Sequence, residues 1–169
     1  RGVAELAHGF GMEVNAFDPY VSAEQTAELD CLMHDDVDGL FRACTHISVH
    51  CNLSEDTHHL VNRERLAMMP DIGVDGTACG SHIVNCARGG IVDESAVLDA
   101  LDSGILSSAA LDVFEVEPAI GNLLLQHERF HGSPHIGAAT LEAQTRVGTE
   151  MAGLLVAFFN GERPKSAIN

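Results

Sequence analysis

Three side chains that could act together on a small acidic molecule stand near the ends of short apolar runs. Arg88 follows the run at Ile83 and Val84, while Glu117 and His135 lie further along the chain. The planar guanidinium of arginine binds a carboxylate through two parallel hydrogen bonds. A histidine whose ring is held by a carboxylate can take and give a proton near neutral pH. We therefore expect acid–base chemistry on a carboxylate-bearing substrate, provided that the fold brings the three residues together.

Each of these residues also has a simpler interpretation. Arg88 could be a surface arginine that pairs with Asp93 or Glu94. Glu117 and His135 could be unrelated surface groups, since the chain holds 25 acidic residues and 10 histidines. Only the fold can bring two residues so far apart in the sequence into contact, so the sequence leaves both interpretations open.

A further acidic residue, Asp18, ends the first expected strand. Dinucleotide-binding folds place an acid there to accept hydrogen bonds from the adenosine ribose, and its charge repels the 2′-phosphate of NADP. Asp18 also precedes Pro19, and an Asp-Pro pair is common in ordinary turns. Position alone supports both a ribose-binding residue and a turn residue.

The histidines and cysteines do not form a metal-binding pattern. His127, His131 and His135 recur every fourth residue, but glycine, serine and proline at 132–134 break any helix there. The cysteines are odd in number, widely spaced and without a C-x-x-C pair: Cys31, Cys44, Cys51, Cys79 and Cys86. We therefore expect no metal, and reduced thiols in a cytoplasmic protein.

Length and charge limit the class of protein. The chain has 169 residues, 46% of them apolar, which is enough for one domain with a packed core. Its net charge of −16 disfavours binding to nucleic acid or to anionic membranes. No apolar stretch reaches the ~18 residues that suggest a membrane span. We expect one globular domain that binds neither nucleic acid nor a membrane.

The apolar patterns predict alternating helices and strands. Helices are expected at 1–10, 22–33, 35–43, 62–69, 93–103 and 140–159, strands at 12–17, 45–50, 83–87 and 107–114, and irregular segments at 70–82 and 119–133. This alternation predicts an α/β fold with a parallel sheet and right-handed crossovers. Gly9-x-Gly11 is not a nucleotide fingerprint, because it follows a helix and precedes a strand.

Three motifs, in this order, carry a resemblance to a known family. They are VNCARGGIVDE at 84–94, ALDVFEVEP at 110–118 and SPHIG at 133–137. The chain resembles the NAD-binding domain of the D-isomer-specific 2-hydroxyacid dehydrogenases. The resemblance implies a Rossmann-like, doubly wound parallel sheet that binds NAD.

The resemblance also implies roles for individual residues. Arg88 would hold the carboxylate and carbonyl oxygen of the substrate, and His135, oriented by Glu117, would exchange the proton of its 2-oxygen. The residues expected to bind the cofactor are Asp18, His50, Cys51, Cys86, Ala87, Arg88, Asp112, His135 and Gly137. Of these, Asp112 and Gly137 match positions beside the nicotinamide carboxamide.

The implied substrate is a D-2-hydroxy acid or 2-keto acid, and the motifs look most like the branch that acts on 3-phosphoglycerate in serine biosynthesis. Glyoxylate and hydroxypyruvate reductases share much of the pattern. The family also contains NADH-sensing transcriptional corepressors with the same arginine, glutamate and histidine. Against a corepressor stands the sequence at 137–140 (GAAT), where corepressors carry an aromatic residue. The resemblance also implies a homodimer.

The chain departs from the family pattern in three respects. The family's first strand and glycine-rich turn should lie ahead of Arg1, so we expect residues 1–160 to be an N-terminally truncated nucleotide-binding domain. Residues 161–169 would begin the return to a substrate-binding domain that the sequence does not contain, and the fragment alone would be inactive. The segment at 70–82 is longer than the usual short turn, and Asn52 stands where many members have proline.

Overall fold

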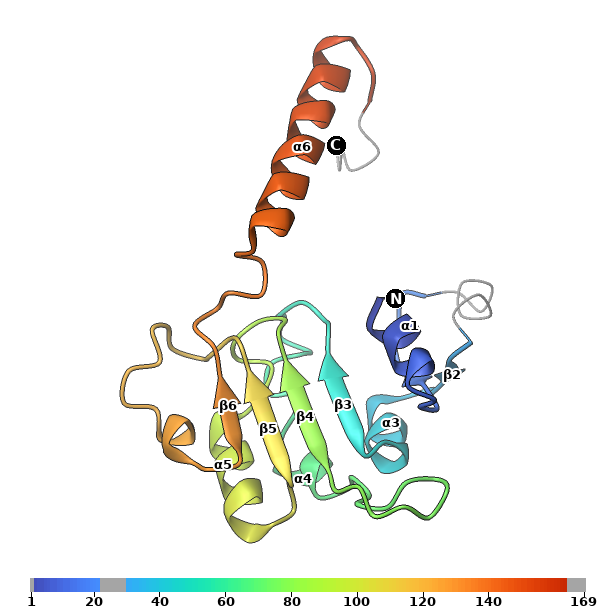
Figure 1. Cartoon of the computed structure of the whole chain (residues 1–169), viewed down its shortest axis with the longest axis vertical. Coiled ribbons are helices and arrows are strands. Elements are labelled where there is room, and N and C mark those ends of the chain that lie inside the picture. Colours follow the sequence, from blue (N-terminus) through green and yellow to red (C-terminus); the bar gives the residue numbers. More distant parts are fainter. Residues whose placement is uncertain (1, 22–29, 164–169) are drawn as a thin grey trace.

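The fold is built on a four-stranded sheet. The computed structural model describes residues 2–21 and 30–163. All four strands are parallel, in the order β3-β4-β5-β6 (Figure 1): β3 is His46–Val49, β4 His82–Asn85, β5 Ser108–Leu111 and β6 Phe130–Gly132. A separate two-stranded parallel sheet pairs β1 (Asn15–Ala16) with β2 (Leu32–Met33). The expected parallel α/β fold is confirmed.

Helices alternate with these strands. They are α1 (Gly2–Gly9), α3 (Val37–Ala43), α4 (Arg63–Leu66), α5 (Glu94–Ser103), a 3-10 helix η1 (Leu123–Gln126) and α6 (Leu141–Phe159). The side chains of Asp36, Asn62 and Asp93 accept hydrogen bonds from backbone amides at the starts of α3, α4 and α5. These caps satisfy amides that have no partner inside the helix, which is why the helices begin where the sequence predicts.

The main sheet buries one of its two faces. Side chains along β3, β4 and β5 alternate between buried and more exposed positions, as the two-residue period of a strand requires. The buried side chains form one core with α5, whose Val97 and Leu101 are 0% exposed. On the other face Ser48 and Val84 remain exposed. Within the described residues, therefore, the core lies on one side of the sheet.

Two sequence-based predictions were wrong. The segment at 119–133 is not irregular throughout, because it contains η1 and the edge strand β6. β6 was missed because only three residues pair with β5, too few for a visible alternation. Leu32 and Met33, expected at the end of a helix, form β2. The rest of that expected helix, residues 22–29, lies outside the described residues, as does most of the expected return segment at 161–169.

The glycine-rich segment at 70–82 forms a compact loop at the amino ends of the strands. An antiparallel bridge joins Ile72 to Ala78, and the amides of Cys79 and Gly80 donate to the carbonyl of Asp71. The segment returns at Ser81, whose hydroxyl donates to the carbonyl of Pro70. It is therefore an ordered hairpin-like loop at the edge opposite the strands' carboxyl ends.

Helix α6 stands apart from the sheet (Figure 1). It begins at the expected residue, where the side chain of Thr140 accepts a hydrogen bond from the amide of Ala143. None of its residues is buried, and Val147 and Phe158 are each 62% exposed. Among the described residues, no helix has both the length and the apolar composition needed to cross a bilayer.

Replacing Leu101 should test the packing of α5 on the sheet. Leu101→Ala removes a completely buried side chain, so we expect the free energy of unfolding to fall by about 3 kcal/mol. Urea denaturation followed by circular dichroism would measure the loss. Leu123→Ala is the matched control, because Leu123 is 62% exposed. Equal effects of the two substitutions would contradict this account of the core.

Candidate functional site

The predicted chemical residues gather at one edge of the main sheet. Arg88 follows β4, Asp112 follows β5, and Ser133 and His135 follow β6. Because all four strands are parallel, their carboxyl ends meet at the same edge (Figure 1). Open parallel sheets bind their ligands at this edge.

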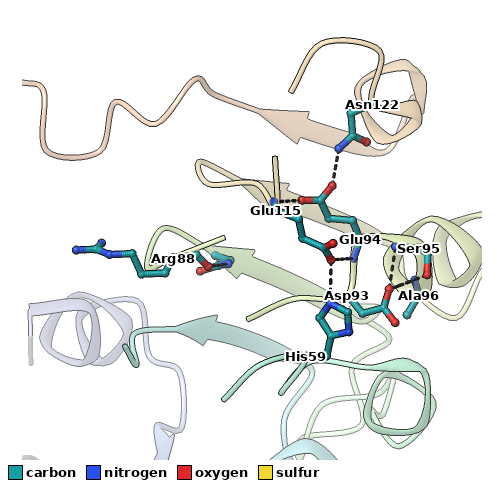
Figure 2. A network of polar contacts seen from close by, with 9 residues as sticks. His59, Arg88, Asp93, Glu94, Ser95, Ala96, Glu115 and Asn122 are labelled. Atoms are coloured by element: carbon teal, nitrogen blue, oxygen red, sulfur yellow. Dashed lines mark hydrogen bonds and ion pairs between the residues drawn. The ribbon is translucent and has the colours of Figure 1, made fainter. Parts of the chain in front are cut away.

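The loop after β4 is held by the side chain of Asn85, which is 1% exposed. Its Nδ2 donates to the carbonyl of Arg88 (3.0 Å), and its Oδ1 accepts from the amide of Ala87 (2.9 Å). Arg88 itself is exposed and donates to the carbonyl of Ala87. Its guanidinium points away from the Glu94–Glu115 contacts (Figure 2). Among the described residues no ion pair involves Arg88, so the alternative of a surface pair with Asp93 or Glu94 is not formed.

The same loop lies directly against the segment that follows β5. A Cβ atom added to Gly89 would come 1.8 Å from the carbonyl oxygen of Phe114. Any side chain at position 89 would therefore push the two loops apart, which explains the glycine. This contact fixes the position of the Arg88 loop relative to the segment that carries Glu117.

Glu117 and His135 are in direct contact, although 18 positions separate them in the sequence. Nδ1 of His135 lies 2.8 Å from Oε2 of Glu117. The other carboxylate oxygen of Glu117 accepts from the amide of Phe114 at 3.0 Å. The hydrogen bond with His135 and then that from Phe114 lower the pKa of Glu117, so its carboxylate is charged at neutral pH. The interpretation as unrelated surface groups is thus excluded.

The buried carboxylate of Asp112 holds the segment that contains His135. Oδ1 accepts from the hydroxyl of Ser133 (2.5 Å) and the amide of Ile136 (2.9 Å), and Oδ2 accepts from the amide of Gly137 (2.7 Å). Burial opposes ionisation of this 4% exposed residue, but these hydrogen bonds outweigh burial and lower its pKa. A charged carboxylate therefore holds the chain on both sides of His135, through the Ser133 hydroxyl before it and the Ile136 and Gly137 amides after it.

His135 occupies an unusual backbone conformation. Its φ is +55°, in the left-handed region that residues with a Cβ seldom adopt. Its amide donates to the carbonyl of Asp112 at 2.8 Å. Surrounding hydrogen bonds must maintain such a conformation, and conformations of this kind are frequent at functional sites.

The remaining predicted cofactor residues differ in their surroundings. Asp18 is exposed and its Oδ1 accepts from the amide of Tyr20, which is the turn geometry of the alternative interpretation. His50, just after β3, lies with Nε2 2.8 Å from Oγ of Ser48, and partial burial lowers its pKa. Burial also raises the pKa of the neighbouring Cys51 thiol.

Cys86 and Gly137 lie close to the carboxylate of Asp112. Partial burial, and then the charge of Asp112, raise the pKa of the Cys86 thiol. A Cβ added to Gly137 would lie 2.9 Å from Oδ2 of Asp112, so a bulkier residue would disturb the hydrogen bond to the Gly137 amide. Both predicted positions therefore lie beside the segment that carries His135.

A depression of about 210 Å³ lies at the carboxyl edge of the sheet. Seven residues line it: Cys86, Ala110, Leu111, Asp112, His131, Gly132 and Ser133. Ordinary small-molecule sites enclose roughly 300–1,000 Å³, so this depression suits part of a dinucleotide rather than all of it.

Sequence reasoning missed three residues of this site. Asn85 holds the Arg88 loop, Ser133 binds Asp112, and Glu94 binds the segment after β5. A polar residue ending an apolar strand was a usable signal for Asn85. The other two act across long sequence distances, which no local pattern reveals. Within residues 2–21 and 30–163, no three histidine, cysteine or acidic side chains are placed to hold a metal ion.

A parallel sheet with an arginine and a histidine–carboxylate pair at its carboxyl edge is an open α/β domain that is arranged to bind a ligand at that edge. Residues 1–137 match the family model described as D-isomer specific 2-hydroxyacid dehydrogenase, NAD binding domain. The chain belongs to this family, and the matched domain is the one that binds NAD.

Known relatives and solved structures agree with this assignment. The chain is 38% identical over 167 residues to a D-3-phosphoglycerate dehydrogenase of Bacillus subtilis, a match that covers 99% of this chain and 30% of that protein. It is 43% identical over 152 residues to a hydroxypyruvate reductase of Thermotoga maritima, covering 88% and 46% of the two chains. A D-lactate dehydrogenase from Treponema pallidum has a TM-score of 0.80 at 30% identity, covering 98% and 51%. The chain thus spans about half or less of each relative.

Replacing Asp112 should loosen the segment that carries His135. In Asp112→Asn the amide nitrogen faces a backbone amide, leaving one buried donor without an acceptor. We expect the free energy of unfolding at neutral pH to fall by about 2 kcal/mol, measured by urea denaturation. Asp56→Asn is the control, since Asp56 is exposed.

The loss of unfolding free energy caused by Asp112→Asn should also depend on pH. Because the pKa of Asp112 is lowered in the folded state, its stabilisation is complete above its unfolded pKa, roughly 4, and is lost as the pH falls through the folded pKa. The gap between wild type and Asp112→Asn should therefore narrow below about pH 4. If the difference in unfolding free energy between the two proteins stayed constant in acid, the charge of the Asp112 carboxylate would not be the source of the stabilisation.

Proposed function

We propose that the protein is an NAD-dependent dehydrogenase that interconverts D-2-hydroxy acids and 2-keto acids, with 3-phosphoglycerate as the leading substrate. One observation supports the reaction above all others. The carboxylate of Glu117 holds Nδ1 of His135 at 2.8 Å, at the sheet edge that also carries Arg88. This arrangement is suited to acid–base chemistry on a carboxylate-bearing molecule.

In the proposed reaction Arg88 binds the substrate. Its guanidinium is exposed and can donate two hydrogen bonds to the substrate carboxylate or one to the 2-oxygen. The hydrogen bonds between the Asn85 side chain and the backbone of Ala87 and Arg88 hold the loop beneath it. The bound acid is thereby oriented before any proton moves.

His135 exchanges the proton. With Nδ1 bonded to Glu117, Nε2 is the ring nitrogen that faces the substrate. In oxidation it takes the proton of the 2-hydroxyl while the hydrogen on C2 leaves as hydride, and a carbonyl forms; in reduction it returns the proton to the oxygen. The charged Glu117 stabilises the imidazolium that forms. Bound NAD would accept the hydride, and Cys86, Asp112 and Gly137 are among the residues that would hold it at this edge.

The substrate assignment rests on the relatives. A D-3-phosphoglycerate dehydrogenase and a hydroxypyruvate reductase are both similar to this chain, so hydroxypyruvate is the main competing substrate. A cytoplasmic homodimer is part of the proposal. The free thiols of Cys44, Cys51, Cys79 and Cys86 agree with a reducing compartment.

The test is NADH-linked turnover by the intact protein that carries this chain. We expect phosphohydroxypyruvate to be reduced with the highest kcat/KM, compared with hydroxypyruvate and glyoxylate. A preference for hydroxypyruvate would assign the protein to the reductases. NADH-dependent capture of a protein partner without turnover of any acid would favour a sensing module instead.

Substitutions should separate the two proposed roles. His135→Ala should lower kcat by about 10²-fold or more, because proton transfer in the transition state is lost. Arg88→Ala should also raise KM, because Arg88 binds the substrate before the reaction as well. Arg42→Ala is the control, since Arg42 is an exposed arginine on α3. Near-normal turnover in either site variant would refute the role assigned to that residue.

A further inference from the structure

The turn between Phe114 and Glu117 is held by two carboxylates from different parts of the chain. The amide of Phe114 donates to Glu117 Oε1, and the next amide, that of Glu115, donates to Oε1 of Glu94 at 2.6 Å. Glu94 is the first residue of α5, 21 positions earlier. Figure 2 shows its side chain reaching the segment after β5.

The peptide between Phe114 and Glu115 is fixed on both sides. Its carbonyl oxygen lies against Gly89, where a Cβ would come within 1.8 Å. Its N–H group donates to Glu94. The plane of this peptide is therefore determined by the Arg88 loop on one side and by α5 on the other.

The contact between Glu94 and this turn is reinforced from two directions. The amide of Glu94 donates to Oε1 of Glu115 at 3.4 Å, and the same oxygen lies 3.0 Å from Nε2 of His59. Oε2 of Glu94 accepts a hydrogen bond from Nδ2 of Asn122 (Figure 2). Asn122 in turn caps η1 through its Oδ1, which accepts from the amide of Leu124.

We propose that Glu94 is a positioning residue, which through the Glu115 amide and Asn122 fixes the turn that aligns Glu117 with His135. This inference rests on the proposed function, because it assigns importance to the Glu117–His135 pair. Glu94 does not reach that pair itself. It acts by holding the Phe114–Glu115 peptide, which directly follows the Phe114 amide that donates to Glu117.

Two single substitutions and their combination test this proposal. Glu94→Gln keeps the shape of the side chain but leaves only one oxygen for two donors. Asn122→Asp keeps an oxygen for the Leu124 amide but replaces the donor to Glu94 with a repelling carboxylate. The double variant restores both contacts, because the new amide group at position 94 can accept from the Glu115 amide through its oxygen and donate to the new carboxylate at position 122 through its nitrogen.

The first measurement is the carboxyl titration of Glu117, followed by ¹³C NMR in the intact protein. The wild-type pKa of Glu117 is lowered by its hydrogen bonds with His135 and Phe114. We expect the pKa of Glu117 to rise toward its ordinary value in both single variants. In the double variant it should fall back to the wild-type value. Glu64→Gln, which removes the first-turn acid of α4, should leave it unchanged.

The second measurement is turnover. Each single variant should lower kcat by about 10-fold, with a smaller change in KM, because misalignment of an acid–base pair mainly affects the transition state. The double variant should recover most of the loss. Circular dichroism and thermal unfolding identify any variant that has simply lost its fold, and the recovery in the double variant would not occur in that case.

The two readouts separate this inference from the proposed function. If the intact protein turns over none of the acids, the proposed function fails, while the Glu117 titration still reports on the hold by Glu94. An unchanged Glu117 titration in both single variants would overturn the inference. A double variant as impaired as the single variants, in titration and in kcat, would overturn it as well.

Discussion

The buried carboxylate of Asp112 maintains the geometry of the candidate site. It lies at the end of β5 and accepts hydrogen bonds from Ser133 and from the amides of Ile136 and Gly137. A charge can remain buried there only because three donors compensate for the lost water. Those donors all flank His135, so the strained backbone of that residue is maintained by the charge beneath it.

The other chemical residues are fixed by contacts between neighbouring strand ends. The loop that carries Arg88 touches the segment after β5 at Gly89, where no side chain would fit. Glu117 lies on that segment and binds His135, which follows β6. Three consecutive strands of a parallel sheet therefore supply one group each, and backbone contacts set the relative positions of these groups. Such positioning on short, well-bonded loops is what acid–base chemistry requires.

The many acidic residues of the sequence are also represented in this site. Four carboxylates act in or around it, and each has a distinct set of partners: Glu94, Asp112, Glu115 and Glu117. Backbone amides and the rings of His59 and His135 supply most of the donors.

Local patterns in the sequence were enough to predict the parallel α/β class and helix starts within about one residue of Asp36, Asn62 and Asp93. They offered Arg88, Glu117 and His135 only as candidates, and the roles expected for these residues came from the family resemblance. Those patterns are capping side chains, alternating apolar residues and polar groups at strand ends. Three features became visible only in the folded chain: Glu117 touches His135, the carboxylate of Asp112 binds the backbone around His135, and β6 completes the sheet. Each of these depends on strands pairing across long stretches of chain, and local sequence patterns do not encode which distant amide a carboxylate will meet.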